Sequence, residues 1–155
     1  MGTEIERKFL VLNSNYRKGA SSGFYRQGYL LSEREKVVRV RVCNAKGYLS
    51  VKGMANGITR PEFEYEIPEQ DANEMLDTFC RDAILEKNRY ILNVKGFRWE
   101  IDEFLGSNEG LVVAEIELQS ESEAFPRPDW LGVEVSLDPR YYNNNLVRHP
   151  FREWR

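Results

Sequence analysis

The sequence predicts a mainly β protein, α+β in class, that is built on an antiparallel sheet. Three observations lead to this prediction. Short segments alternate between apolar and polar side chains, and in residues 36–42 Arg39 and Arg41 share one face while valines occupy the other. An Asn-Gly pair and similar turn sequences join these segments by hairpins. One longer segment, residues 69–81, instead has apolar residues at helical spacing.

Each expected element follows from its local pattern. Residues 13–22 are polar and form a loop, hairpin chemistry recurs at 44–47, and Pro68 ends a strand just before the helix at 69–81. Alternation predicts strands at 3–12, 23–31, 36–42, 48–52, 62–67, 85–92, 97–104, 111–118 and 133–137. The sequence Ser120-Glu121-Ser122-Glu123 fits a capping box and predicts a short helix, and a closing helix is expected at 140–148.

Composition restricts the class of protein. The 155 residues suffice for one domain with a sizeable core, and we expect a single domain over residues 1–155. A net charge of −3 argues against a general nucleic-acid binder or a membrane-surface protein, and no apolar run is long enough to cross a membrane. Cys43 and Cys80 lack metal-binding spacing and are expected to be reduced thiols, which favours a cytoplasmic protein without a signal peptide.

The polar faces of the expected strands carry matched charges instead of the mixed residues of an ordinary exposed face. In residues 3–12, alternation points Glu4, Glu6 and Lys8 in one direction. For this strand alone, a solvated sheet face explains the charges equally well. The later strands repeat the pattern with the bases Arg39, Arg41, Lys52, Lys87 and Arg89, and with the acids Glu62, Glu64, Glu100, Asp102, Glu115 and Glu117.

If the sheet closes into a barrel, which also removes its free edges, these charges converge on one lumen. A lumen lined by both signs of charge cannot be a dry core, because unpaired buried charge is too costly. The charges therefore fit a strongly anionic ligand that arrives with metal cations. A polyphosphate with Mg²⁺ or Mn²⁺ meets both requirements, since Arg and Lys bind phosphate oxygens and carboxylates bind hard divalent ions.

The segment Glu4-Ile5-Glu6-Arg7-Lys8 resembles the E-x-E-x-K signature of the CYTH superfamily, also called triphosphate tunnel metalloenzymes. Further similarities follow in order along nearly the whole chain, at Arg26-Gln27-Gly28-Tyr29-Leu30, Arg39-x-Arg41, Lys52, Glu62-x-Glu64, Glu86-Lys87-x-Arg89-Tyr90, Glu100-x-Asp102, Glu115-x-Glu117 and Asp138-x-Arg140-Tyr141-x-Asn143. The resemblance implies a closed antiparallel eight-stranded β-barrel tunnel with a few flanking helices, which binds triphosphates with divalent metal. Members include inorganic tripolyphosphatases, thiamine triphosphatases and class IV adenylyl cyclases, and the chain is most similar to the short bacterial tripolyphosphatases.

One segment departs from the short members of the family, which often carry lysines after a late Arg-Tyr pair. Here the pair Arg140-Tyr141 is followed by Tyr142 and three asparagines, so that end of the lumen has less positive charge. The preferred length of the phosphate chain, and any binding of a nucleotide there, stay open.

The leading hypothesis is a metal-dependent hydrolase that releases phosphate from a triphosphate, ideally inorganic tripolyphosphate. One metal ion would bridge phosphate oxygens and acidic residues, and a second would position and acidify the attacking water. By resemblance, Tyr29 with a neighbouring lysine acts as general base, while the alternative is an aromatic residue that fills the tunnel end. The expected metal ligands are Glu4, Glu6, Asp102, Glu115 and Glu117, with Glu62, Glu64 and Glu100 as further lumen acids. The expected phosphate ligands are Lys8, Arg39, Arg41, Lys52, Lys87 and Arg89, of which Lys8 and Lys52 are also expected to be catalytic.

Two alternatives stay open. A class IV-type adenylyl cyclase would make cyclic AMP from ATP, but no segment obviously supplies an adenine pocket. A non-catalytic module would hold polyphosphate or a nucleotide without turnover, although all four acidic pairs that suit a metal are present. The expected partner is a small-molecule triphosphate, with neither nucleic acid nor membrane, and a homodimer is a further expectation.

Overall fold

The computed structural model describes residues 2–154, and nine strands dominate this part of the chain. The strands are β1 (Gly2–Val11), β2 (Ser21–Ser32), β3 (Lys36–Cys43), β4 (Lys46–Gly53), β5 (Thr59–Ile67), β6 (Ile84–Val94), β7 (Phe97–Phe104), β8 (Val112–Glu117) and β9 (Leu131–Glu134). The helices are α1 (Glu69–Phe79) and α2 (Asn143–Arg148), with 3₁₀ turns η1 (Asn15–Arg17), η2 (Gly106–Asn108), η3 (Pro139–Tyr141) and η4 (Phe151–Glu153).

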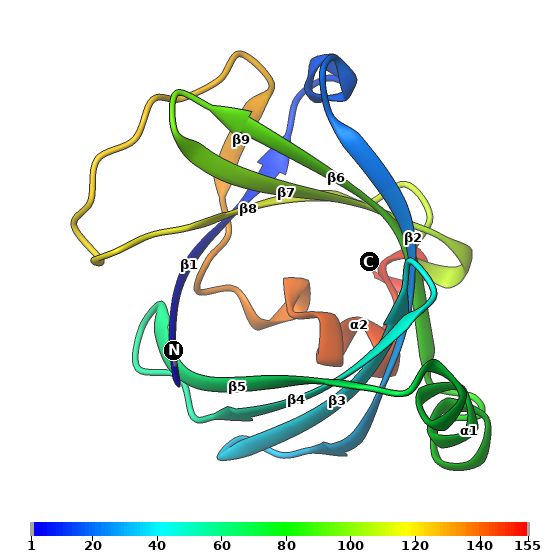
Figure 1. Cartoon of the computed structure of the whole chain (residues 1–155). Helices are drawn as coiled ribbons and strands as arrows, with labels where there is room; N and C mark the ends of the chain where they lie inside the picture. Colours follow the sequence, from blue (N-terminus) through cyan, green and yellow to red (C-terminus); the bar gives the residue numbers. More distant parts are fainter. Residues whose placement is uncertain (1, 155) are drawn as a thin grey trace.

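Eight of these strands close into an antiparallel barrel in the order β5-β4-β3-β2-β6-β7-β8-β1 (Figure 1). Closure is made by β1, whose first residues pair with β5 from Gly2↔Glu62 to Ile5↔Thr59. Farther along the same strand, Phe9 and Val11 pair with β9, which adds a ninth strand outside the ring. The prediction of a closed eight-stranded barrel is therefore confirmed.

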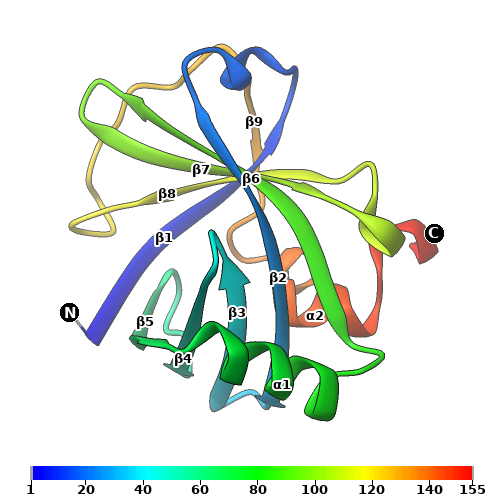
Figure 2. The same ribbon diagram turned by 45° about the vertical axis from the view of Figure 1, so that its right-hand side comes forward.

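Alternation along the strands sends apolar side chains outward, where two clusters cover the barrel. In the first cluster, Phe9 and Trp99 meet edge to face with ring centroids 5.9 Å apart, under the segment that leads into β9. In the second cluster, Ala72 and Leu76 of α1 pack on Val40 of β3. Helix α1 thus lies against the outer face of the sheet formed by β2, β3 and β4 (Figure 2). Because the outside carries the hydrophobic core, the inside is free to hold polar groups.

One end of the lumen is closed by a third apolar cluster. Leu85, Phe104 and Val113 lie on the inward faces of β6, β7 and β8, and they pack with Tyr141 and with the fully buried Leu146 of α2. The outward apolar faces and this internal plug leave a charged cup that opens at the opposite end. The alternating pattern does not reveal this plug, because the segment that supplies Tyr141 and Leu146 is not a strand.

Two predicted helices need correction. The chain forms a turn at residues 120–123 instead of the predicted helix. Glu123 Oε1 accepts from the N–H of Gln119 at 2.7 Å instead of the N–H of Ser120, and Pro126 and Pro128 follow at once and disfavour further helical residues. The closing helix is shorter than residues 140–148, because Tyr142 has extended dihedrals of φ −73° and ψ 134° between η3 and α2. No helix in residues 2–154 is long and apolar enough to span a membrane.

The packing of α1 predicts a clear asymmetry between two of its residues. Leu76 is fully buried against the barrel, whereas Phe79 on the same helix is 68% exposed. Leu76→Ala is expected to lower the free energy of unfolding by about 2–5 kcal/mol, because it leaves a cavity in the core. Phe79→Ala is expected to change it by less than about 0.5 kcal/mol. Urea denaturation of both variants measures the difference, and equal losses would contradict this account of the helix.

Candidate active site

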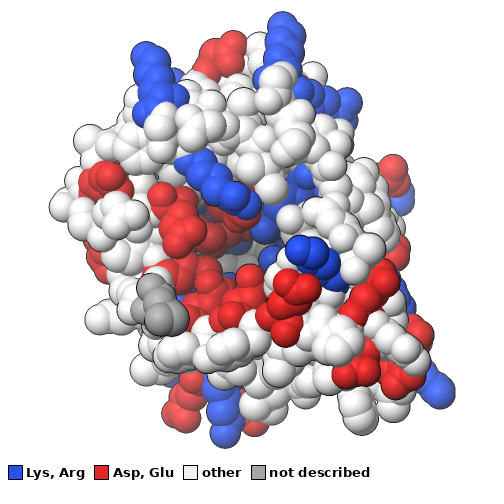
Figure 3. Space-filling model, in the orientation of Figure 1, with Lys and Arg blue, Asp and Glu red and all other residues white. Residues whose placement is uncertain are grey.

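The lumen contains a cavity of about 240 Å³ whose walls carry both signs of charge. Acidic and basic side chains surround a central hollow when the molecule is viewed into the open end (Figure 3). The cavity lining includes the predicted residues Glu4, Glu6, Lys8, Tyr29, Arg39, Arg41, Lys52, Glu62, Glu64, Lys87, Arg89, Glu100, Glu115 and Glu117. The barrel therefore brings together all of the predicted site residues except Asp102.

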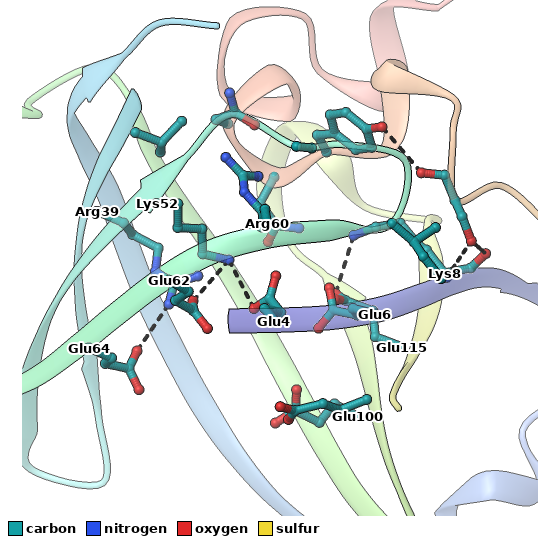
Figure 4. A pocket seen from close by; sticks show the side chains of 18 of the residues that line it. Glu4, Glu6, Lys8, Arg39, Lys52, Arg60, Glu62, Glu64, Glu100 and Glu115 are labelled. Atoms are coloured by element: carbon teal, nitrogen blue, oxygen red, sulfur yellow. Dashed lines mark hydrogen bonds and ion pairs between the residues drawn. The ribbon is translucent and has the colours of Figure 1, made fainter. Parts of the chain in front are cut away.

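Near the open end, Lys52 and Arg39 each lie next to a carboxylate (Figure 4). Lys52 Nζ lies 3.4 Å from Glu4 Oε2 and 3.1 Å from Glu62 Oε2, so one lysine of β4 joins the acids of β1 and β5. Arg39 Nη2 lies 3.1 Å from Glu64 Oε2. These ion pairs compensate the charges of the lumen without filling the cavity.

Deeper in the lumen, Lys8 Nζ lies 3.3 Å from Glu115 Oε1. Glu6 projects from the same face of β1 as Lys8, and it pairs in register with Glu117 of β8. Acids from two neighbouring strands therefore crowd around one lysine.

This crowding affects the protonation of the acids. Burial raises the pKa of Glu4 to about 7, and the neighbouring carboxyl of Glu62 contributes. Burial raises the pKa of Glu6 well above its ordinary value, with the charge of Glu115 as the next cause. Carboxylates that repel each other in this way suit a divalent cation, which would compensate both charges. The donor set of the lumen thus fits a hard metal ion.

Beyond the cavity, a buried network holds Asp102. Arg89 donates from Nε to Asp102 Oδ1 at 2.7 Å and from Nη2 to Oδ2 at 2.9 Å, while Lys87 Nζ donates to Oδ2 at 2.8 Å. Asp102 is 1% exposed, and although burial opposes ionisation, Arg89 and Lys87 hold its pKa down at about 2. Both of its oxygens are therefore engaged by cations. The expectation that Asp102 binds metal stays a prediction.

Several residues that line the lumen are absent from the predicted set. The cavity lining also includes Arg60, Ser136, Tyr142, Asn143 and Asn144. Arg60 was detectable, because it lies on the same face of β5 as Glu62 and Glu64 in a strict alternation. The neutral lumen residues could not be detected from the sequence, because residues such as serine and asparagine are common on any exposed surface.

The fold and the lumen together define a class of closed barrel whose inner wall is lined with paired acids and bases. A family model described as the CYTH domain matches residues 2–145, and the chain belongs to this family. An inorganic triphosphatase of Acetivibrio thermocellus is 54% identical over 155 residues, which cover 100% of this chain and 99% of that protein. An inorganic triphosphatase of Nitrosomonas europaea is 35% identical over 150 residues, covering 94% of this chain and 97% of that protein.

Solved structures agree with this family. The crystal structure of an inorganic triphosphatase is similar at a TM-score of 0.67 and 32% identity, covering 92% of this chain and 96% of that chain. A candidate adenylyl cyclase from Hippeastrum, described as having a dominant triphosphatase activity, has a TM-score of 0.54 at 17% identity and covers 77% of this chain and 80% of its own. At that identity the second comparison shows the fold alone.

The buried network predicts that Asp102 is needed for stability. Asp102→Asn removes the charge that compensates Lys87 and Arg89, and the free energy of unfolding is expected to fall by about 3 kcal/mol. Asp77→Asn is the matched control, because Asp77 is exposed and pairs with Arg26 on the outside, where the loss is expected to stay under about 1 kcal/mol. Chemical denaturation in EDTA checks both values, and an unchanged Asp102→Asn variant would favour the metal-ligand role instead.

Proposed function

We propose that this protein is a divalent-metal-dependent triphosphatase whose main substrate is inorganic tripolyphosphate. One observation carries the proposal: seven cationic side chains and a set of crowded carboxylates line a single cavity of about 240 Å³ that is closed at one end. A linear chain of phosphates with bound cations is a ligand that satisfies both sets of groups. The two inorganic triphosphatases that match nearly the whole chain support the same reaction.

The basic residues would bind the phosphates and stabilise the charge that develops as the anhydride bond breaks. Lys8 and Lys52 project from β1 and β4 beside the crowded acids, so they would lie next to the reacting phosphoryl group. Tyr29 lines the same cavity, and its hydroxyl accepts a hydrogen bond from Gln27 Nε2 at 3.1 Å. Tyr29 as general base, with a neighbouring lysine, remains part of the proposal.

The metal would be Mg²⁺ or Mn²⁺, held chiefly by Glu4, Glu6, Glu115 and Glu117. When bound, such an ion neutralises phosphate charge and activates water for attack. Within residues 2–154, no three acidic, histidine or cysteine side chains converge into a ready-made metal cage. The carboxylates would therefore share the ion with phosphate oxygens of the substrate. Glu62, Glu64 and Glu100 would provide further negative charge in the same lumen.

The small cavity favours an inorganic substrate over a nucleotide. Pockets that enclose drug-sized ligands usually measure about 300–1,000 Å³, so the lumen would leave the adenosine of ATP at the mouth. This argues against the cyclase reaction, which needs the ribose 3′-hydroxyl at the reacting phosphate. A non-catalytic binding module is the second alternative.

The cytoplasmic location rests on the free thiols Cys43 and Cys80, and it stays a prediction. A homodimer likewise stays a prediction.

The proposed metal role predicts a specific effect at Glu6. Glu6→Gln keeps the shape of the side chain but removes a hard anionic ligand, so kcat/KM is expected to fall about a hundredfold or more. The free energy of unfolding is expected to stay the same or rise, because burial and Glu115 already disfavour the charge. Phosphate release at limiting Mg²⁺ and urea denaturation measure the two effects. Glu74→Gln on the exposed side of α1 is the control, and near-full turnover by Glu6→Gln would rule out the metal role.

The cavity size predicts an order of substrates. Tripolyphosphate can use every lumen cation, so its kcat/KM is expected to exceed that of ATP by about tenfold or more, since the adenosine adds little to transition-state binding. Assays of phosphate release and cyclic AMP on tripolyphosphate, ATP and thiamine triphosphate, with Mg²⁺ and Mn²⁺, test this order. Cyclic AMP as the main product would establish the cyclase instead. Tight binding without any phosphate release would establish the binding module.

A further inference from the structure

Arg41 differs from the other five predicted phosphate ligands of the lumen. Each of those five lies within ion-pair distance of a carboxylate, as Lys8 does with Glu115 and Arg89 does with Asp102. Among residues 2–154, no carboxylate lies close enough to Arg41 to form an ion pair. Its guanidinium is nevertheless buried, with only 8% of the residue exposed. Arg41 is therefore a buried cation without a direct carboxylate partner in the described part of the chain.

The surroundings of Arg41 disfavour its charge. Burial, together with the positive charges of Arg39 and Arg89, lowers the pKa of Arg41 to about 10. A guanidinium ordinarily stays protonated at any physiological pH, so the positive charge is kept at a cost in free energy. An anion that enters the cavity would remove that cost, because Arg41 lines the cavity wall.

Two neutral side chains hold this guanidinium. Gln27 Oε1 accepts a hydrogen bond from Arg41 Nε at 3.1 Å, and Gln27 is completely buried. The amide group of Gln27 is fixed in turn, because its Nε2 donates to the Tyr29 hydroxyl at 3.1 Å and to Asn143 Oδ1 at 3.3 Å. These contacts occupy only Nε of Arg41, and its terminal nitrogens have no hydrogen-bond partner in the described part of the chain.

The second neutral group is the ring of Tyr25. Arg41 Cζ lies 5.2 Å from the ring centroid and Arg89 Cζ lies 5.0 Å from it, so two guanidinium groups contact one aromatic ring. The negative face of an aromatic ring attracts cations without neutralising them. Tyr25 is itself buried and 7% exposed. The ring thus supports Arg41 without neutralising its charge.

We propose that Gln27 and Tyr25 are positioning residues that hold Arg41 by neutral contacts, so that its full charge is available to a phosphate group of the substrate. This inference rests on the proposed function, because it assigns the anion to the triphosphate. A carboxylate in place of Gln27 would still accept the hydrogen bond from Arg41 Nε, but it would neutralise the guanidinium and lose the donor to Asn143 Oδ1. Neutrality at position 27, rather than orientation alone, is therefore the property that supports substrate binding.

The test compares Gln27→Glu with the same change on the outer surface. Gln27→Glu is expected to raise KM for tripolyphosphate about tenfold or more, with kcat changed much less, because the lost interaction binds ground state and transition state alike. Its calorimetric Kd for tripolyphosphate in EDTA should rise by a similar factor, while the melting temperature without ligand stays the same or rises. Gln70→Glu on exposed α1 adds the same charge and should behave like the unaltered protein.

Tyr25 gives an independent arm if Gln27→Glu does not fold. Tyr25→Phe keeps the ring and should keep KM, whereas Tyr25→Leu removes the ring and should raise KM. Tyr90→Leu is the control for loss of a stacked ring, because Tyr90 stacks with Arg17 on the outside of the barrel, and it should leave KM unchanged. If Gln27→Glu or Tyr25→Leu binds tripolyphosphate within twofold of the unaltered protein, the inference fails and the proposed function stands. Absence of tripolyphosphate binding by the unaltered protein would overturn both.

Discussion

Charges inside a closed barrel have to be compensated, and the rest of this structure depends on that constraint. An ion removed from water loses several kcal/mol of solvation, which an ion pair or a ligand has to restore. The network of Asp102, Lys87 and Arg89 achieves this with protein groups alone, at 2.7–2.9 Å, and it anchors β6 to β7. Elsewhere in the lumen, compensation is partial. Arg41 has neutral partners, and Glu6 is crowded by other acids. The lumen therefore combines a self-sufficient structural network with groups that need an anion and a cation.

The fold was largely predictable because strand alternation has a period of two, which a single sequence reveals. In β3, for example, Arg39 and Arg41 mark the inward face and the valines that alternate with them mark the outward face. The same alternation in eight strands identifies the residues of the lumen. Alternation does not give depth along the barrel axis, however. Glu100 and Asp102 both point inward, yet Glu100 lines the cavity and Asp102 is buried beyond it. Depth depends on the tilt and stagger of the strands, and these follow from the whole set of pairings.

The closed end was the part that the sequence could not reveal. Tyr141 and Leu146 form the plug from a segment of 3₁₀ and short helical turns, where no long period exists to be recognised. The asparagines that follow Tyr142 lie at this end, and Asn143 accepts hydrogen bonds from Lys87 and Gln27. Neutral amides thus orient the cations that are present instead of adding more charge. The site depends on such neutral contacts, although charged residues alone made it recognisable.

The most direct measurement is a crystal structure of the protein with tripolyphosphate and Mn²⁺, in which anomalous scattering locates the metal. The account predicts the phosphate chain inside the barrel, with phosphate oxygens on the terminal nitrogens of Arg41 and with Mn²⁺ between phosphate oxygens and the carboxylates of Glu4, Glu6 or Glu115. The adjacent pairs of Lys87 and Arg89 with Asp102 should be unchanged. A phosphate chain bound outside the lumen, or Mn²⁺ bound away from these carboxylates, would contradict the central claim that the partly compensated lumen is the active site.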